Sequence, residues 1–117
     1  MNKKISLEPK YLKMTEAILQ NRLGGSEIKV YVFGSRARNA AKETSDIDLA
    51  LDGGAKLDYF KIICALKNDF EESDIKYSAD IIDLNAIDES FKNHIKDDLI
   101  EIKYSVKKKS IDFGKVK

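Results

Sequence analysis

Two aspartates lie at alternate positions of an apolar segment, and a glycine–serine pair precedes them. Gly34 and Ser35 are followed by ten residues, after which come Asp46 and Asp48. Side chains two positions apart on a strand point to the same face, so these carboxylates repel each other unless a cation lies between them. Mg²⁺ prefers such hard oxygen ligands and shares its coordination shell with nucleotide phosphates. The pattern therefore predicts a metal site for phosphate chemistry.

The segment that begins at Gly34 has features suited to binding phosphate. Glycine adopts positive φ and lets the backbone approach a ligand closely. Ser35 is placed to open a short helix whose free N–H groups face an anion. Arg36 and Arg38 follow, and we expect at least one of them to contact phosphate because the guanidinium fork matches phosphate oxygens. Together with the aspartates, this segment predicts a nucleoside triphosphate site.

Regular elements must position these residues, and hydrophobic periodicity indicates where they lie. The predicted order is helix 7–23, strand 28–33, a short helix or turn 35–42, strand 46–52, helix 57–72, strand 78–84, helix 89–97 and a last strand 99–106. Four apolar residues of the second long helix recur at near-helical spacing and are expected to face the core: Phe60, Ile63, Leu66 and Phe70. Asp88 is expected to cap the helix after it. This order predicts an α+β domain, α/β-like in its alternation, with a mixed central sheet and helices packed on it.

The sequence GSRAR…SDIDLAL resembles the signature of the polymerase-β-type nucleotidyltransferase superfamily. It is most similar to the smallest members, the minimal nucleotidyltransferases known as MNT-domain proteins. One position departs from that pattern, because Asn39 stands where the family often has glycine. Asparagine also tolerates the left-handed region, so we treat the change as mild.

The resemblance implies the nucleotidyltransferase fold, with the site at one edge of the sheet. It implies that Asp46 and Asp48 bind two Mg²⁺ ions that hold ATP, and that a third carboxylate comes from the neighbouring strand. Asp80 and Asp83 are both candidates, and three residues apart they face opposite sides of the sheet, so only one can join the site. We choose Asp80, which matches the family's apolar-Asp-apolar pattern, and keep Asp83 as the alternative.

The same resemblance suggests an activity and a partner. MNT-domain proteins pair with helical HEPN-domain toxins, and some transfer AMP from ATP to a tyrosine of that partner. We therefore expect a Mg²⁺-dependent adenylyltransferase that acts as the antitoxin of a toxin–antitoxin pair. Two alternatives stay open: a non-catalytic antitoxin that neutralises its partner by occlusion, and nucleotidyl transfer to a small molecule.

Composition limits the remaining choices. The 117 residues, 43% hydrophobic and 35% charged, predict one domain over 1–117 with a basic tail from about 107 to 117. Residues 43–101 carry six lysines against sixteen acids, which disfavours a continuous basic groove for nucleic acid. No apolar run is long enough for a membrane span, and the N-terminus lacks a secretory signal pattern. A single cysteine, Cys64, excludes an intrachain disulfide. We expect a cytoplasmic protein and leave homo-oligomerisation open.

Overall fold

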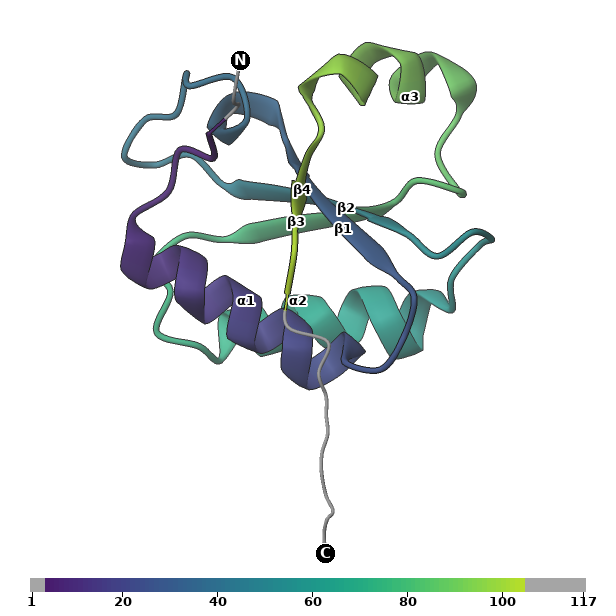
Figure 1. Ribbon diagram of the computed structural model, residues 1–117, viewed down its shortest axis with the longest axis horizontal. Helices are drawn as coiled ribbons and strands as arrows, with labels where there is room; N and C mark the ends of the chain where they lie inside the picture. The colour runs from purple at the N-terminus through teal and green to yellow at the C-terminus, as the bar shows by residue number, and fades with distance from the viewer. Residues whose placement is uncertain (1–3, 105–117) are drawn as a thin grey trace, which may run out of the picture.

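A four-stranded mixed sheet forms the centre of the computed structural model, which describes residues 4–104 (Figure 1). The strand order is β3-β2-β1-β4. β1 (Lys29–Phe33) runs antiparallel to both β2 (Ile47–Asp52) and β4 (Ile100–Ile102), whereas β3 (Ala79–Asp83) runs parallel to β2. The predicted α+β class and mixed sheet are confirmed. The predicted basic tail lies outside the described residues.

Helices cover the two faces of this sheet unequally. α1 (Pro9–Leu23) and α2 (Ala65–Glu71) pack on one face, while the shorter α3 (Glu89–Ile95) lies on the opposite side (Figure 1). Pro9 occupies the first turn of α1, where a missing N–H costs no hydrogen bond, and the Gly24 N–H ends the helix by donating to the Gln20 carbonyl. Across residues 4–104, no helix is long and apolar enough to cross a bilayer.

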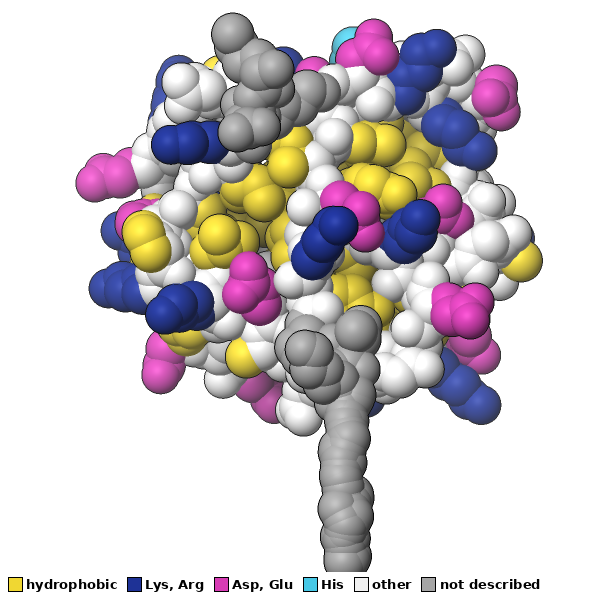
Figure 2. All heavy atoms as spheres, in the orientation of Figure 1, with side chains coloured by type: hydrophobic (Ala, Val, Ile, Leu, Met, Phe, Trp, Pro, Cys, Tyr) yellow, Lys and Arg dark blue, Asp and Glu magenta, His cyan; other side chains and the backbone are white. Residues whose placement is uncertain are grey.

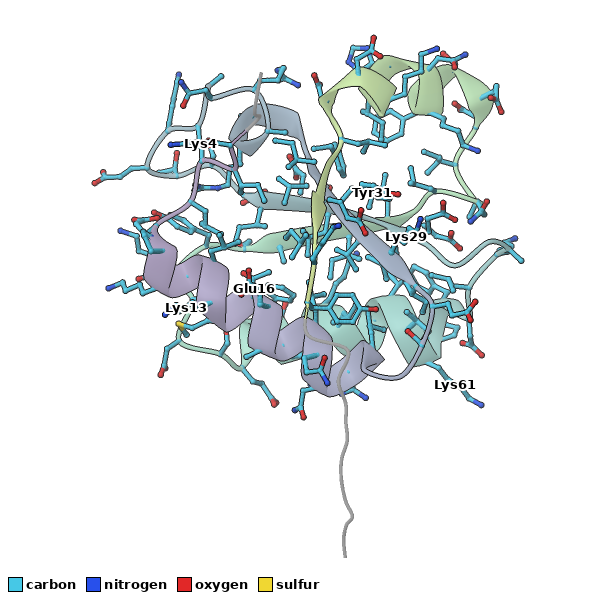
Figure 3. All side chains as sticks on the ribbon, viewed as in Figure 1. Lys4, Lys13, Glu16, Lys29, Tyr31 and Lys61 are labelled. Carbon is cyan, nitrogen blue, oxygen red and sulfur yellow. The ribbon has the colours of Figure 1, made fainter. Side chains whose placement is uncertain are left out.

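Strand alternation separates a large core from a smaller one. Val30, Val32 and Leu49 point toward α1 and α2 and are fully buried. The opposite face carries a smaller cluster built around Phe33 and Ala50, into which α3 inserts Ile95. Figure 2 shows apolar side chains gathered beneath α3, and Figure 3 shows Lys29 and Tyr31 projecting from β1 away from α1. The sheet face away from α1 and α2 is therefore only partly covered.

One predicted helix changes its geometry along its length. The segment predicted as helix 57–72 starts with a π-helical stretch, Tyr59–Cys64, before continuing as α2. Because π turns hold more residues than α turns, the expected stripe loses its phase at the first turn. Phe60 is 77% exposed, so its predicted burial is wrong, whereas Phe70 is 2% exposed as expected. The Asp88 cap is confirmed, since its carboxylate accepts from the Phe91 N–H at 2.8 Å.

These two phenylalanines give a matched test of the fold. We expect Phe70→Ala to lower the free energy of unfolding by about 3–5 kcal/mol, because it leaves a cavity between α2 and the sheet. Phe60→Ala removes an exposed ring and should change that free energy by no more than about 0.5 kcal/mol. Urea unfolding followed by circular dichroism measures both. Equal losses for the two variants would contradict the π-helical start of this helix.

Candidate active site

The turn after β1 is built around a direct contact between Gly34 and Asp48. The chain leaves Phe33 in a short 3₁₀ helix, Gly34–Arg36, and Gly34 has φ 75°, which favours glycine. A Cβ atom added at Gly34 would collide with the Asp48 carboxylate. Glycine is therefore required twice, by its backbone conformation and by the side chain beside it. The two halves of the predicted site meet at this contact.

Strand register brings the acidic residues to the same end of the sheet. Asp48 on β2 pairs with Asp80 on the parallel strand β3, and it pairs with Phe33 on the other side. Residues in register on parallel strands point to the same face, so the Asp48 and Asp80 side chains are neighbours. Asp46 lies two residues earlier, just before β2 begins. Asp46 and Asp80 are exposed, whereas Asp48 is half-buried against the Gly34 turn.

Asp83, the alternative third carboxylate, has a different role. It is buried and lies on the sheet face opposite Asp80. One carboxylate oxygen accepts from the Leu57 N–H at 2.7 Å, and the other accepts from the Asn85 N–H at 2.9 Å. These bonds hold the connections that follow β2 and β3. Of the two candidates, the structure places only Asp80 beside Asp48.

The surroundings of Asp48 disfavour the charged form of its carboxylate. Burial raises the pKa of Asp48 to about 6, with further raising contributions from the negative charges of Asp80 and Asp46. Arg36 and Arg38 lower that pKa but do not offset the other effects. A cation bound here would relieve the repulsion.

The residues near Asp48 suit a divalent cation in their chemistry and in their position. Three carboxylates supply hard oxygen donors, and the lack of a Cβ at Gly34 leaves the backbone close to one of them, Asp48. Across the described part of the chain, however, no group of three or more histidine, cysteine or acidic side chains is arranged closely enough to hold a metal ion. Asp46 and Asp80 are exposed, so their side chains have room to rotate toward Asp48. The residues fit a metal site that is open, with its ligand set not preassembled.

The two arginines differ sharply in what they contact. Arg38 is exposed and forms an ion pair with Asp98, with 2.9 Å between Nη1 and the carboxylate. Arg36 is only 3% exposed, and its guanidinium donates hydrogen bonds to the backbone carbonyls of Ser6 and Ser45. The phosphate contact predicted for these arginines is therefore geometrically open to Arg38, whereas the Arg36 fork is already engaged.

The remaining turn residues follow the sequence expectations more closely. Asn39 has φ 58°, so the residue that replaces the family glycine does adopt the left-handed conformation. Ser35 is half-buried in the 3₁₀ helix, and its carbonyl accepts from the Ala40 N–H. These two positions shape the turn on which Gly34 lies.

Sequence reasoning missed a hollow beside Asp46. An open hollow of about 390 Å³ is lined by Glu43, Thr44, Asp46, Lys76, Tyr77 and Ser78. The segment just before β3 supplies three of these residues, and nothing in its composition marks it as part of a site. Only the parallel pairing of β2 with β3 brings it beside Asp46.

Comparisons with known proteins find a matching family, a similar protein and a similar solved structure. A family model described as polymerase beta nucleotidyltransferase matches residues 15–108, a range that contains every acidic residue of the candidate site. A Haemophilus influenzae protein described as a probable protein adenylyltransferase, MntA, is 33% identical over 92 residues, covering 79% of this chain and 78% of that protein. A crystal structure of a candidate nucleotidyltransferase from Sulfolobus solfataricus matches with a TM-score of 0.49 and 24% identity, covering 79% of this chain and 78% of that one.

The raised pKa of Asp48 predicts a change in stability of known sign. An acid whose folded-state pKa lies above its unfolded value destabilises the fold once it ionises, and this penalty develops as pH rises from about 4 to above 6. Asp48→Asn should therefore stabilise the metal-free protein at pH 7.5 by roughly 1–2 kcal/mol, after allowance for solvent screening, and by less at pH 5. Thermal unfolding in the presence of a chelator measures both values.

Asp52 offers the matched control on the same face of β2. Its pKa is lowered, chiefly by hydrogen bonds from the Asn85 side chain and the Gly54 N–H. Asp52→Asn should therefore destabilise the protein at pH 7.5, the opposite direction from Asp48→Asn. A loss of stability in both variants would contradict the electrostatic description of Asp48.

Proposed function

The chain belongs to the polymerase beta nucleotidyltransferase family, and from this premise we propose that it transfers AMP from ATP to a hydroxyl group of a partner protein. The family makes it a nucleotidyltransferase, an enzyme that acts on a nucleotide substrate. The choice of a protein acceptor is supported by the 33% identical relative described as a protein adenylyltransferase. The single observation that carries the proposal is the register of Asp48 with Asp80 against the Gly34 turn.

In the proposed reaction the acceptor oxygen attacks the α-phosphorus of ATP. A new oxygen–phosphorus bond forms, the bond from the α-phosphorus to the α–β bridging oxygen breaks, pyrophosphate leaves and the hydroxyl proton passes to solvent. Asp46, Asp48 and Asp80 would hold the two Mg²⁺ ions that we propose. When bound, such ions neutralise charge on the triphosphate and on the attacking and leaving oxygens. Gly34, Ser35 and Arg38 are proposed to orient the departing phosphates, since backbone N–H groups in a turn and a guanidinium suit these oxygens.

The acceptor is proposed to be a tyrosine of a HEPN-domain toxin in the cytoplasm, with this chain as antitoxin. This part rests on the resemblance to MNT-domain proteins. The exposure of Asp46 and Asp80 supports it, because a hydroxyl on the surface of another protein must reach the carboxylates from solvent. The hollow beside Asp46 provides room for such an approach.

One observation favours a second candidate function. Across the described part of the chain, the carboxylates are not arranged closely enough to hold a metal ion. A protein that neutralises its partner by occlusion does not need them to be. In that case binding alone silences the toxin, and ATP is not consumed. The two functions predict different behaviour for the same carboxylate variants.

Labelling with α-³²P ATP separates these functions. With wild-type protein and Mg²⁺ we expect label on the partner. In Asp48→Asn the labelling rate should fall roughly a hundredfold or more, because metal binding contributes several kcal/mol of transition-state stabilisation. Asp52→Asn, which changes a carboxylate at the other end of the same strand, should keep the wild-type rate at a temperature where it is folded.

The partner's toxicity is the second measurement. If the Asp46→Asn/Asp48→Asn double variant leaves the partner toxic, transfer of AMP is required for neutralisation. If that variant still silences the partner and wild-type protein transfers no label, occlusion is the function and the transferase proposal is wrong.

A further inference from the structure

A buried cation lies directly behind the acidic site. Arg36 closes the 3₁₀ helix that starts at Gly34, and its side chain turns inward instead of toward solvent. The guanidinium carbon lies 4.1 Å from the centroid of the Tyr77 ring, a distance that favours a cation–π interaction. Tyr77 is itself fixed, because its hydroxyl donates to the Glu8 carboxylate at 2.8 Å. The guanidinium of Arg36 therefore packs against a ring that Glu8 holds in place.

The guanidinium fork holds the peptide unit that leads into Asp46. Arg36 Nη2 and Nε both donate to the Ser45 carbonyl, at 2.8 and 3.2 Å. This carbonyl belongs to the same peptide group as the Asp46 nitrogen. Arg36 Nη1 donates to the Ser6 carbonyl at 2.7 Å, and the Ser6 N–H donates back to the Arg36 carbonyl at 2.7 Å. The Gly34 turn and Asp46 are thus joined through one side chain.

Few other contacts restrain Asp46 on the side of the loop that precedes it. Residues 42–44 are exposed, and the bond from the Lys42 N–H to the Ser45 hydroxyl is internal to the loop. On the far side, the Ile47 N–H donates to the Ser78 carbonyl at 2.8 Å and starts the pairing with β3. Asp46 therefore lies between two anchors, the Arg36 fork before it and the strand pairing after it.

We propose that Arg36 is a positioning residue that fixes Asp46 relative to the Gly34 turn, instead of a ligand for phosphate. The inference rests on the proposed nucleotidyl transfer only in that it concerns the same carboxylates. A planar fork can bind one carbonyl through two N–H groups and still reach a second carbonyl, whereas a lysine ammonium has no such fixed geometry. The shape of the side chain, more than its charge, should therefore determine where Asp46 lies.

The test uses Arg36→Lys, which keeps the charge, together with Arg36→Met, which removes it. Two readouts need no ATP: hydrogen exchange of the amides of residues 45–48, and Mn²⁺ binding followed by electron paramagnetic resonance. Both variants should show at least tenfold faster exchange at these amides and at least tenfold weaker Mn²⁺ binding. In the transfer reaction, kcat should fall at least tenfold while the KM for ATP changes less than threefold. If Arg36→Met does not fold, Arg36→Lys carries the test.

Two arginines provide comparison variants. Arg22→Met breaks the paired hydrogen bonds to Asp69 that join α1 to α2, and it should lower thermal stability while leaving the site readouts unchanged. Arg38→Met should raise the KM for ATP without affecting exchange at residues 45–48, as expected for an exposed phosphate ligand.

Each contrary result has a distinct meaning. Wild-type exchange and Mn²⁺ binding in Arg36→Lys, with only ATP affinity lost, would identify Arg36 as a phosphate ligand and overturn the inference. Unchanged exchange in both Arg36 variants would overturn it as well. If wild-type protein bound no Mn²⁺ and transferred no AMP, the proposed function would fail, whereas exchange at residues 45–48 would still decide whether Arg36 fixes Asp46.

Discussion

The contact between Gly34 and the Asp48 carboxylate is the constraint on which the site depends. The backbone at residue 34 must have positive φ and must also leave the space that any Cβ would fill. Only glycine meets both conditions without displacing the carboxylate. Because β1 and β2 are antiparallel neighbours, this contact sets the end of one strand against the start of the other. The Gly34 turn and the acidic residues are therefore placed together by the sheet itself.

The rest of the fold keeps that contact in place by burying the opposite face of the same strands. Leu49 and Leu51 alternate with Asp48 on β2 and are fully buried against α1 and α2. A slip of one residue in the strand pairing would move these leucines to the opposite, less covered face and Asp48 into the larger core. The hydrophobic effect therefore fixes the register, and the register places Asp48 beside Asp80.

Sequence reasoning succeeded where one segment contains the whole signal. The spacing of Gly34, Asp46 and Asp48 is local, and so is the capping of α3 by Asp88. The residues alone do not decide between Asp80 and Asp83. The choice requires knowing which face of the sheet each side chain occupies, and the pairing of β3 with β2 determines that face. The burial of Phe60 was predicted wrongly because a π-helical turn changes the phase that periodicity assumes. The engagement of Arg36 could not be foreseen, since one of its carbonyl partners is thirty residues away.

An acidic patch that lowers the stability of the ligand-free protein suits an enzyme whose substrate binds cations of its own. Burial of Asp48, together with repulsion from Asp80 and Asp46, raises its pKa and lowers the stability of the free protein, and apolar burial on the other face of the sheet outweighs this cost. Nucleoside triphosphates bind divalent cations in solution, and their arrival together would convert this repulsion into attraction. In the proposed reaction, exposed Asp46 and Asp80 would rotate inward, while half-buried Asp48, held against Gly34, would provide the fixed ligand around which they close. On this proposal, one rigid carboxylate and two adjustable ones would couple metal binding to the binding of the substrate.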